Sequence, residues 1–199
     1  MRIRAPSYAA CAVYLTLAAS LALAQEGGKA PMPPPRVEPP QASPTSGPQM
    51  AGEQGGRVHP GDPAPDFELD GSLGKPVKLT SMRGDWLILV FADRSSGINE
   101  MNEIEYEARK LGARIVGICH EKMQSIMQRA VREPVQFVVL SDPTGQVTAT
   151  YGLWDSQQRR SIPGYVIVDR RGKVKLAVMG QSFPPADVLK LTRYAITGA

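Results

Sequence analysis

The sequence predicts an α/β domain, a three-layer sandwich around a central mixed sheet. Apolar runs with the length of buried strands alternate with stretches in which apolar residues recur at helical spacing, a pattern typical of parallel strands joined by helices. Near the C-terminus, two apolar stretches flank a short polar turn, which adds an antiparallel hairpin to the sheet. The sequence contains no internal repeat, so a single domain accounts for the pattern.

The first expected elements are two short strands, a longer strand and a helix. Residues 67–69 and 76–79 are expected to form strands on either side of a glycine turn. Residues 86–92 form a continuous apolar run, as expected for a central strand that is buried on both faces. Residues 99–111 predict a helix that ends at Gly112. Its apolar residues fall on one face: Met101, Ile104, Ala108 and Leu111.

The second half of the domain continues the alternation. Residues 114–119 are the next expected strand, and a second amphipathic helix follows and stops before Pro134. The expected inner face of that helix comprises Met123, Ile126, Met127, Ala130 and Val131. The remaining expected elements are a strand at 136–140, a short helix at 146–151, a hairpin of 164–168 and 174–179, and a closing helix at 186–197.

The N-terminus has the pattern of a secretory signal peptide over residues 1–24. Arg2 and Arg4 precede an apolar, alanine-rich run at 9–23, and the small residues Ala22 and Ala24 form a cleavage site. We therefore expect an exported protein, periplasmic or secreted. The run is shorter than the roughly 20 residues of a comfortable membrane span. The alternative is an uncleaved signal anchor that tethers the protein to the membrane.

Residues 25–60 are expected to form a disordered tether, and residues 61–199 the folded domain. The tether is too poor in apolar residues to bury a core, and its prolines favour polyproline conformation. Those prolines are Pro31, Pro33, Pro34, Pro35, Pro39, Pro40, Pro44, Pro48 and Pro60.

Charge and cysteine content exclude several classes of function. The net charge of +4 falls to +2 without residues 1–24, because that segment holds Arg2 and Arg4 and no acid. A nearly neutral domain gives no reason to expect a nucleic-acid partner. Cys119 is then the single cysteine, so the exported chain is expected to form no internal disulfide. No cofactor or metal is expected, since Cys119 and His120 are too few ligands for a closed metal site.

Several short motifs occur in a fixed order along the domain. They are Gly61-Asp62-Pro63-Ala64-Pro65-Asp66-Phe67, Arg83-Gly84 before the strand at 86–91, Ile115-Val116-Gly117-Ile118, Leu140-Ser141-Asp142-Pro143-Thr144-Gly145 followed by Tyr151-Gly152, and Ile162-Pro163-Gly164-Tyr165-Val166-Ile167-Val168-Asp169. Together they resemble the redoxins, the AhpC/TSA or peroxiredoxin-like branch of the thioredoxin superfamily. The resemblance implies a thioredoxin-like fold and a thiol-dependent antioxidant or disulfide oxidoreductase ancestry. It also implies a cis peptide bond before Pro163.

The same resemblance implies that the family chemistry is lost. The reactive cysteines of the thiol-disulfide branch form C-x-x-C at the turn after the central strand, and here those two positions read Ser95 and Ile98. The peroxiredoxin pattern P-x-x-x-[TS]-x-x-C also finds no cysteine there. Peroxide reduction and disulfide exchange both need a sulfur atom, which a serine hydroxyl cannot replace. We therefore expect a degenerate active site, with Ser95 and Ser96 capping the helix that follows.

The leading hypothesis is thus a redox-inactive binding or accessory module rather than an enzyme. Its unknown protein or small-ligand partner would bind at the former active-site edge, which comprises Arg94, Ser96, His120, Ile162 and Pro163. Arg94, Arg159 and Arg160 could form a small anion-binding patch there, or simply a solvated loop.

Two alternatives stay open. Cys119 closes the strand at 114–119, and the following helix N-terminus and His120 could activate its thiol. The protein would then be a one-cysteine peroxide or thiol oxidoreductase with Cys119 as its catalytic residue, although strand-end cysteines are often small buried residues. The other alternative is a membrane-tethered subunit of an envelope complex.

Overall fold

The computed structural model describes residues 56–198. The predicted signal peptide and most of the predicted tether lie outside the described residues. Within residues 56–198 no helix is both long and apolar enough to cross a membrane. Val58 is already packed into the core, with 7% of its surface exposed, so the packed domain begins a few residues before Gly61.

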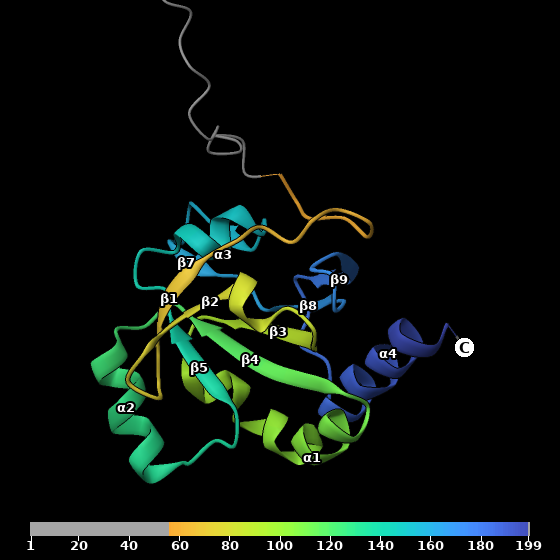
Figure 1. Ribbon diagram of the computed structural model, residues 1–199. Coiled ribbons are helices and arrows are strands. Elements are labelled where there is room, and N and C mark those ends of the chain that lie inside the picture. The colour runs from red at the N-terminus through yellow and green to blue at the C-terminus, as the bar shows by residue number, and fades with distance from the viewer. Residues whose placement is uncertain (1–55, 199) are drawn as a thin grey trace, which may run out of the picture. The chain divides into compact units, whose positions relative to one another are not determined.

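The elements follow the predicted alternation (Figure 1). The strands of residues 56–198 are β1 (Glu68–Gly71), β2 (Pro76–Lys78), β3 (Trp86–Ala92), β4 (Ala113–Cys119), β5 (Val138–Ser141), β6 (Trp154–Asp155), β7 (Arg160–Ser161), β8 (Gly164–Val168) and β9 (Val174–Met179). The helices are α1 (Asn102–Lys110), α2 (Met123–Arg132), α3 (Gln146–Thr150) and α4 (Pro185–Thr197), with the 3-10 helices η1 (Leu79–Met82) and η2 (Ser95–Met101).

Seven strands form one mixed sheet in the order β2-β1-β5-β4-β3-β8-β9. The central strands β5, β4 and β3 are parallel, while β1 and β8 each join this group in the antiparallel sense. Helices connect the parallel strands, and short turns connect the consecutive antiparallel strands β1–β2 and β8–β9. The predicted mixed sheet is therefore confirmed.

Each face of the sheet is covered, which gives the predicted three layers. Alternate residues of β3 point to opposite faces, so Leu89 packs in one core cluster and Ile88 in the other, and neither is exposed to solvent. One cluster lies under η2, α1, α2 and α4, and the other under residues 58–67, η1 and the segment around Tyr151. Burial on both faces explains why the whole of β3 is apolar.

The predicted helix at 99–111 differs from the structure at its N-terminal end. Residues 95–101 form the 3-10 helix η2, and the α-helix begins only at Asn102. The buried residues of η2 are Ser95, Ile98 and Met101. Their spacing of three is the repeat of a 3-10 helix, so this segment buries one face by winding more tightly than an α-helix.

The predicted inner face of α2 is partly wrong. Ile126 is buried, but Met127 is 48% exposed and Val131 is 86% exposed. The helix lies at the margin of the sheet, where its neighbours cover a narrower stripe than the sequence pattern suggests. The short hairpin of β6 and β7 was not predicted, because its turn holds Arg159 at a φ of 50° where glycine or asparagine would be the usual signal.

The peptide bond before Pro163 is trans, so the expected cis bond is wrong. The trans form is the usual state of an X-Pro bond in folded proteins. The chain before Pro163 is extended, and the amide of Ile162 donates a 2.7 Å hydrogen bond to the carbonyl of Leu153.

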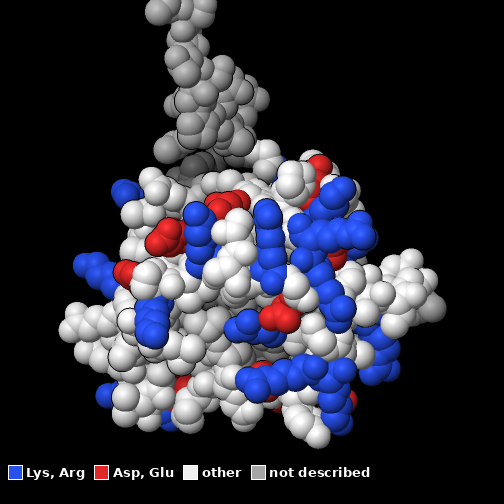
Figure 2. Space-filling view, viewed as in Figure 1, with Lys and Arg blue, Asp and Glu red and all other residues white. Residues whose placement is uncertain are grey.

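Lys and Arg occupy several separate places on the face seen in Figure 1, with Asp and Glu beside some of them (Figure 2). This arrangement is typical of a solvated surface with mixed charge.

Tyr151 links the N-terminal segment of the domain to the core. Its ring is fully buried against Phe67 and Phe91, and its hydroxyl donates a 2.8 Å hydrogen bond to the carbonyl of Pro65. Burial raises the pKa of the Tyr151 hydroxyl far above its ordinary value, so the hydroxyl stays protonated and donates at any physiological pH.

We expect Tyr151→Phe to lower the free energy of unfolding by about 1 kcal/mol, because the partly buried carbonyl of Pro65 loses its donor. Urea denaturation followed by circular dichroism measures this change. The matched control is Tyr106→Phe, since Tyr106 is 66% exposed, and its effect should stay below about 0.5 kcal/mol. Equal effects of the two substitutions would contradict the role given to the Tyr151 hydroxyl.

Candidate functional site

The parallel strands β3 and β4 end side by side, at the edge where the sequence predicted a site. Ala92 and Cys119 are partners in the register, so the loops that follow both strands begin at the same edge. Four of the five predicted binding-edge residues line one open cavity of about 720 Å³: Arg94, Ser96, Ile162 and Pro163. His120 lies at the same edge but does not line this cavity.

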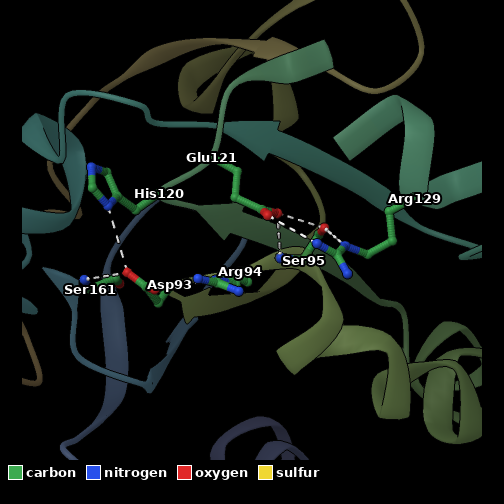
Figure 3. Close-up of polar contacts among 7 residues, drawn as sticks. All are labelled: Asp93, Arg94, Ser95, His120, Glu121, Arg129 and Ser161. Carbon is green, nitrogen blue, oxygen red and sulfur yellow. Dashed lines mark hydrogen bonds and ion pairs between the residues drawn. The ribbon is translucent and has the colours of Figure 1, made fainter. Parts of the chain in front are cut away.

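Ser95, the first of the two positions at which the sequence resemblance leads us to expect a cysteine, is held in a polar network (Figure 3). Its hydroxyl and its backbone amide both donate to one carboxylate oxygen of Glu121, at 2.7 and 2.8 Å. The guanidinium of Arg129 donates to the Ser95 hydroxyl oxygen at 2.9 Å and to the other Glu121 oxygen at 3.2 Å. These bonds join η2, the loop after β4 and helix α2.

The predicted helix-capping role of Ser95 and Ser96 is wrong. Neither η2 nor α1 has a side-chain cap at its N-terminus. The Ser95 hydroxyl instead points to Glu121, and the residue is only 5% exposed. Ser96 is exposed and faces the cavity.

Glu121 is ionised although its side chain is only 12% exposed. Burial alone would raise its pKa. The two hydrogen bonds from Ser95 and the charge of Arg129 outweigh that burial and lower the pKa of Glu121 below its ordinary value. The carboxylate is therefore the charged centre of the network at neutral pH.

Ile98, the second position at which the resemblance leads us to expect a cysteine, is part of the apolar core. It has no exposed surface, and it packs against β4 at Gly117. A Cβ atom at residue 117 would lie 2.3 Å from the Cδ1 atom of Ile98, so the missing side chain of Gly117 makes room for the isoleucine. No polar or reactive group stands at this position.

Cys119 lies beneath the edge with no exposed surface. Burial, followed by the neighbouring charge of Glu121, raises the pKa of its thiol far above the ordinary 9.0; the opposing effect of Arg129 is smaller. A protonated, enclosed thiol lacks both conditions for reaction, a thiolate and access. The geometry thus gives no support to a catalytic Cys119, and burial outweighs the helix N-terminus on which that hypothesis relied.

His120 is paired with an acid and an aromatic ring. Its Nδ1 atom lies 3.6 Å from Oδ1 of Asp93, and its ring meets that of Trp154 edge to face at 4.7 Å between centroids. The same Asp93 oxygen accepts a 3.3 Å hydrogen bond from the amide of Ser161 (Figure 3). Asp93 therefore ties the loop after β3 to both β4 and β7.

Of the predicted arginine patch, Arg94 and Arg160 line the cavity. Arg159 lies in the β6–β7 turn and does not. Within residues 56–198 no three His, Cys, Asp or Glu side chains lie close enough together to hold a metal ion.

Four residues that organise the site were not predicted from the sequence: Asp93, Glu121, Arg129 and Ser161. A signal existed for two of them, because Asp93 and Glu121 directly follow strands that end at the same edge. Arg129 carries no such signal, since it reaches Ser95 from 34 residues away in the sequence.

The sheet order, the covered faces and the turn after β3 define a thioredoxin-fold domain of the redoxin class. The chain belongs to the AhpC/TSA family, whose model matches residues 60–177. Peroxiredoxin Bcp of Escherichia coli is 28% identical over 103 residues, which cover 47% of this chain and 64% of that protein. The match thus spans just under two thirds of this relative. Chloroplastic peroxiredoxin Q of Arabidopsis thaliana is 29% identical over 71% of this chain and 69% of its own length.

Solved structures agree with this assignment. The crystal structure of peroxidoxin BcpB from Mycobacterium tuberculosis superposes with a TM-score of 0.63, at 20% identity, over 71% of this chain and 98% of that one. A candidate thiol:disulfide interchange protein, DsbE from Chlorobium tepidum, superposes with a TM-score of 0.56, at 30% identity, over 70% and 99% of the two chains. The predicted thioredoxin-like fold and redoxin membership are confirmed.

We expect Ser95→Ala to lower the free energy of unfolding by about 2 kcal/mol, because Glu121 and Arg129 each lose a hydrogen bond that involves a charged group. The matched control is Ser96→Ala. Ser96 is the next residue and is exposed, so its substitution should change the free energy of unfolding by less than about 0.5 kcal/mol. Urea denaturation of both variants measures the difference. If Ser95→Ala leaves the free energy of unfolding unchanged, the hydrogen bonds of the Ser95 hydroxyl add nothing to stability.

We also expect the network to weaken in acid. The folded-state pKa of Glu121 lies below its ordinary 4.5, so its stabilising contribution is fully present above pH 4.5 and is lost as the pH falls through the lowered value. Urea midpoints measured from neutral to acid pH for the wild type and Glu121→Gln should therefore converge. A gap between them that stays constant on acidification would contradict this assignment.

Proposed function

We propose that this AhpC/TSA-family domain is a redox-inactive binding module, which uses the cavity at the former active-site edge to hold a partner. One observation carries the proposal: the two positions at which the resemblance implies reactive sulfur, Ser95 and Ile98, hold side chains with other structural roles. Ser95 is bonded within a polar network, and Ile98 fills a space in the core.

The surroundings of Ser95 are unsuited to nucleophilic chemistry. Its hydroxyl donates to Glu121, a carboxylate whose pKa is lowered and which is therefore a weak base. The residue is nearly buried and is not part of the cavity wall. A serine needs an adjacent base of suitable strength to act as a nucleophile, and this one has none.

The cavity, in contrast, has the features of a binding site. Its volume of about 720 Å³ falls in the range of small-molecule pockets, roughly 300–1,000 Å³. Its wall combines apolar residues such as Phe91, Ile162 and Tyr165 with the charged side chains of Arg94 and Arg160. It lies at the carboxyl end of β3, beside the start of β8, and open α/β sheets usually bind ligands at the carboxyl ends of their strands.

The place of action follows from the N-terminal sequence. The signal pattern of residues 1–24 supports export, with the proline-rich segment as a spacer between the signal and the domain. We propose a periplasmic or secreted protein, or one tethered to the membrane if the signal is retained.

We expect the purified chain to show no peroxidase and no disulfide reductase activity above the level of its Cys119→Ser variant. The physical reason is that Cys119 is enclosed and protonated, and residues 56–198 hold no other cysteine. Peroxide consumption with dithiothreitol as reductant and insulin reduction measure the two activities. Activity that disappears in Cys119→Ser would contradict the proposal and establish a one-cysteine oxidoreductase.

Alkylation of Cys119 provides an independent check. Iodoacetamide should label the thiol slowly in the folded protein and rapidly in urea, since unfolding exposes it. Rapid labelling of the folded protein at neutral pH would instead show an accessible thiolate.

A further inference from the structure

We infer that the cavity at the sheet edge recognises a carboxylate attached to an apolar group. This inference deepens the proposed function and rests on it. The carboxylate would pair with Arg160 and Arg94, and its apolar neighbour would lie on the wall formed by Phe91, Ile162 and Pro163.

Arg160 is the principal recognition group. It belongs to β7 and lines the cavity, and within residues 56–198 its guanidinium has no ion pair or side-chain hydrogen bond. A planar guanidinium suits a carboxylate well, because two parallel N–H groups can bind its two oxygens. An unpaired arginine at a cavity wall is thus available for an anionic ligand.

Arg94 adds a second positive charge on the opposite loop. Its closest acid is Asp93, with 4.0 Å between Nε and Oδ2, which is a weak contact, and its side chain is 72% exposed. Arg94 follows β3 whereas Arg160 follows the β6–β7 turn, so two separate segments bring guanidinium groups to one cavity.

The two acids of the cavity wall, Asp93 and Asp155, already accept hydrogen bonds from the protein. Asp93 accepts the Ser161 amide and lies beside His120. Asp155 accepts the backbone amides of Gln157 and Gln158 at 2.9 and 3.0 Å, which fixes its carboxylate in the β6–β7 turn. The wall thus carries two carboxylates and two guanidinium groups, and Arg160 is the one of these four side chains that has no hydrogen bond or ion pair within residues 56–198.

Ser161 supplies an independent observation. It lines the cavity beside Arg160 and is 98% buried, and its hydroxyl oxygen has no hydrogen-bond partner within the described part of the chain. Buried polar atoms are nearly always satisfied, so an exception calls for a partner. A serine hydroxyl can donate to a carboxylate oxygen, so a ligand of this kind could supply the missing partner.

Two probes of equal shape and different charge test the inference. Phenylpropionate carries a carboxylate next to an aromatic group, and phenylpropionamide replaces only the carboxylate. We expect the purified chain to bind the acid with millimolar or better affinity and the amide at least about tenfold more weakly, because a charge-assisted hydrogen bond is lost. Titration calorimetry and amide NMR shifts at Arg160 and Ser161 measure the binding.

Variants locate the site. Arg160→Gln and Arg94→Gln should each weaken binding of the acid about tenfold or more. The matched control is Arg171→Gln, in the turn between β8 and β9, which should bind like the wild type because Arg171 does not line the cavity. Ser161→Ala should weaken binding of phenylpropionate and leave binding of phenylpropionamide unchanged. No variant effect at Arg160, equal binding of acid and amide, or no saturable binding of the acid at millimolar concentration would each overturn the inference.

A peptide with a free C-terminus, Ala-Pro-Phe, identifies the source of the carboxylate. If this tripeptide binds more tightly than phenylpropionate, the cavity recognises the C-terminal end of a peptide. If phenylpropionate binds more tightly, the cavity recognises a small organic acid. Redox activity in the same preparation would contradict the proposed function alone. Equal binding of acid and amide by an inactive protein would contradict this inference alone.

Discussion

The structure of the sheet edge at the ends of β3 and β4 depends on the hydrogen bonds and the ion pair of the Glu121 carboxylate. This carboxylate accepts the amide and the hydroxyl of Ser95 and pairs with Arg129, so one charged group connects η2, the end of β4 and α2. A charge that is nearly buried is tolerated only with such partners, and removing one of them is costly. Fixing Ser95 also fixes the start of η2, and thereby the inward direction of Ile98 and Met101 three and six residues later.

Ser95 and Ile98 each have neighbours that fit their side chains. Ser95 is polar and contacts a carboxylate and a guanidinium, whereas Ile98 is apolar and fits above a glycine in β4. These are opposite requirements, and each is met by residues on a different element. Both side chains therefore belong to a packed and hydrogen-bonded structure that they help to stabilise.

The sequence predicted the framework far better than the contacts of the site. The bounds of β3, β8 and β9 agree with the prediction because each strand is rich in apolar residues and lies between clear turn signals. The edge itself followed from the rule that parallel strands end together. The partners of Ser95 could not be predicted, because Glu121 and Arg129 are 26 and 34 residues away in sequence and only tertiary packing brings them near. The predicted burial of Met127 was wrong for a related reason: helical spacing identifies an apolar face but not how much of that face other elements cover.

The cavity and the buried residues of this segment are separated by the geometry of η2. Ser95, Ile98 and Met101 lie on its buried side, while Arg94, Ser96 and Gly97 line the cavity. Because the inward and outward residues are different, a substitution at Ser95 or Ile98 changes the buried side and leaves the residues that line the cavity in place. The packing of the core and the lining of the cavity are thus separable in this segment. The shape and charge of the cavity depend on the outward residues and on the β6–β7 hairpin, which contributes Asp155, Arg160 and Ser161 to the same lining.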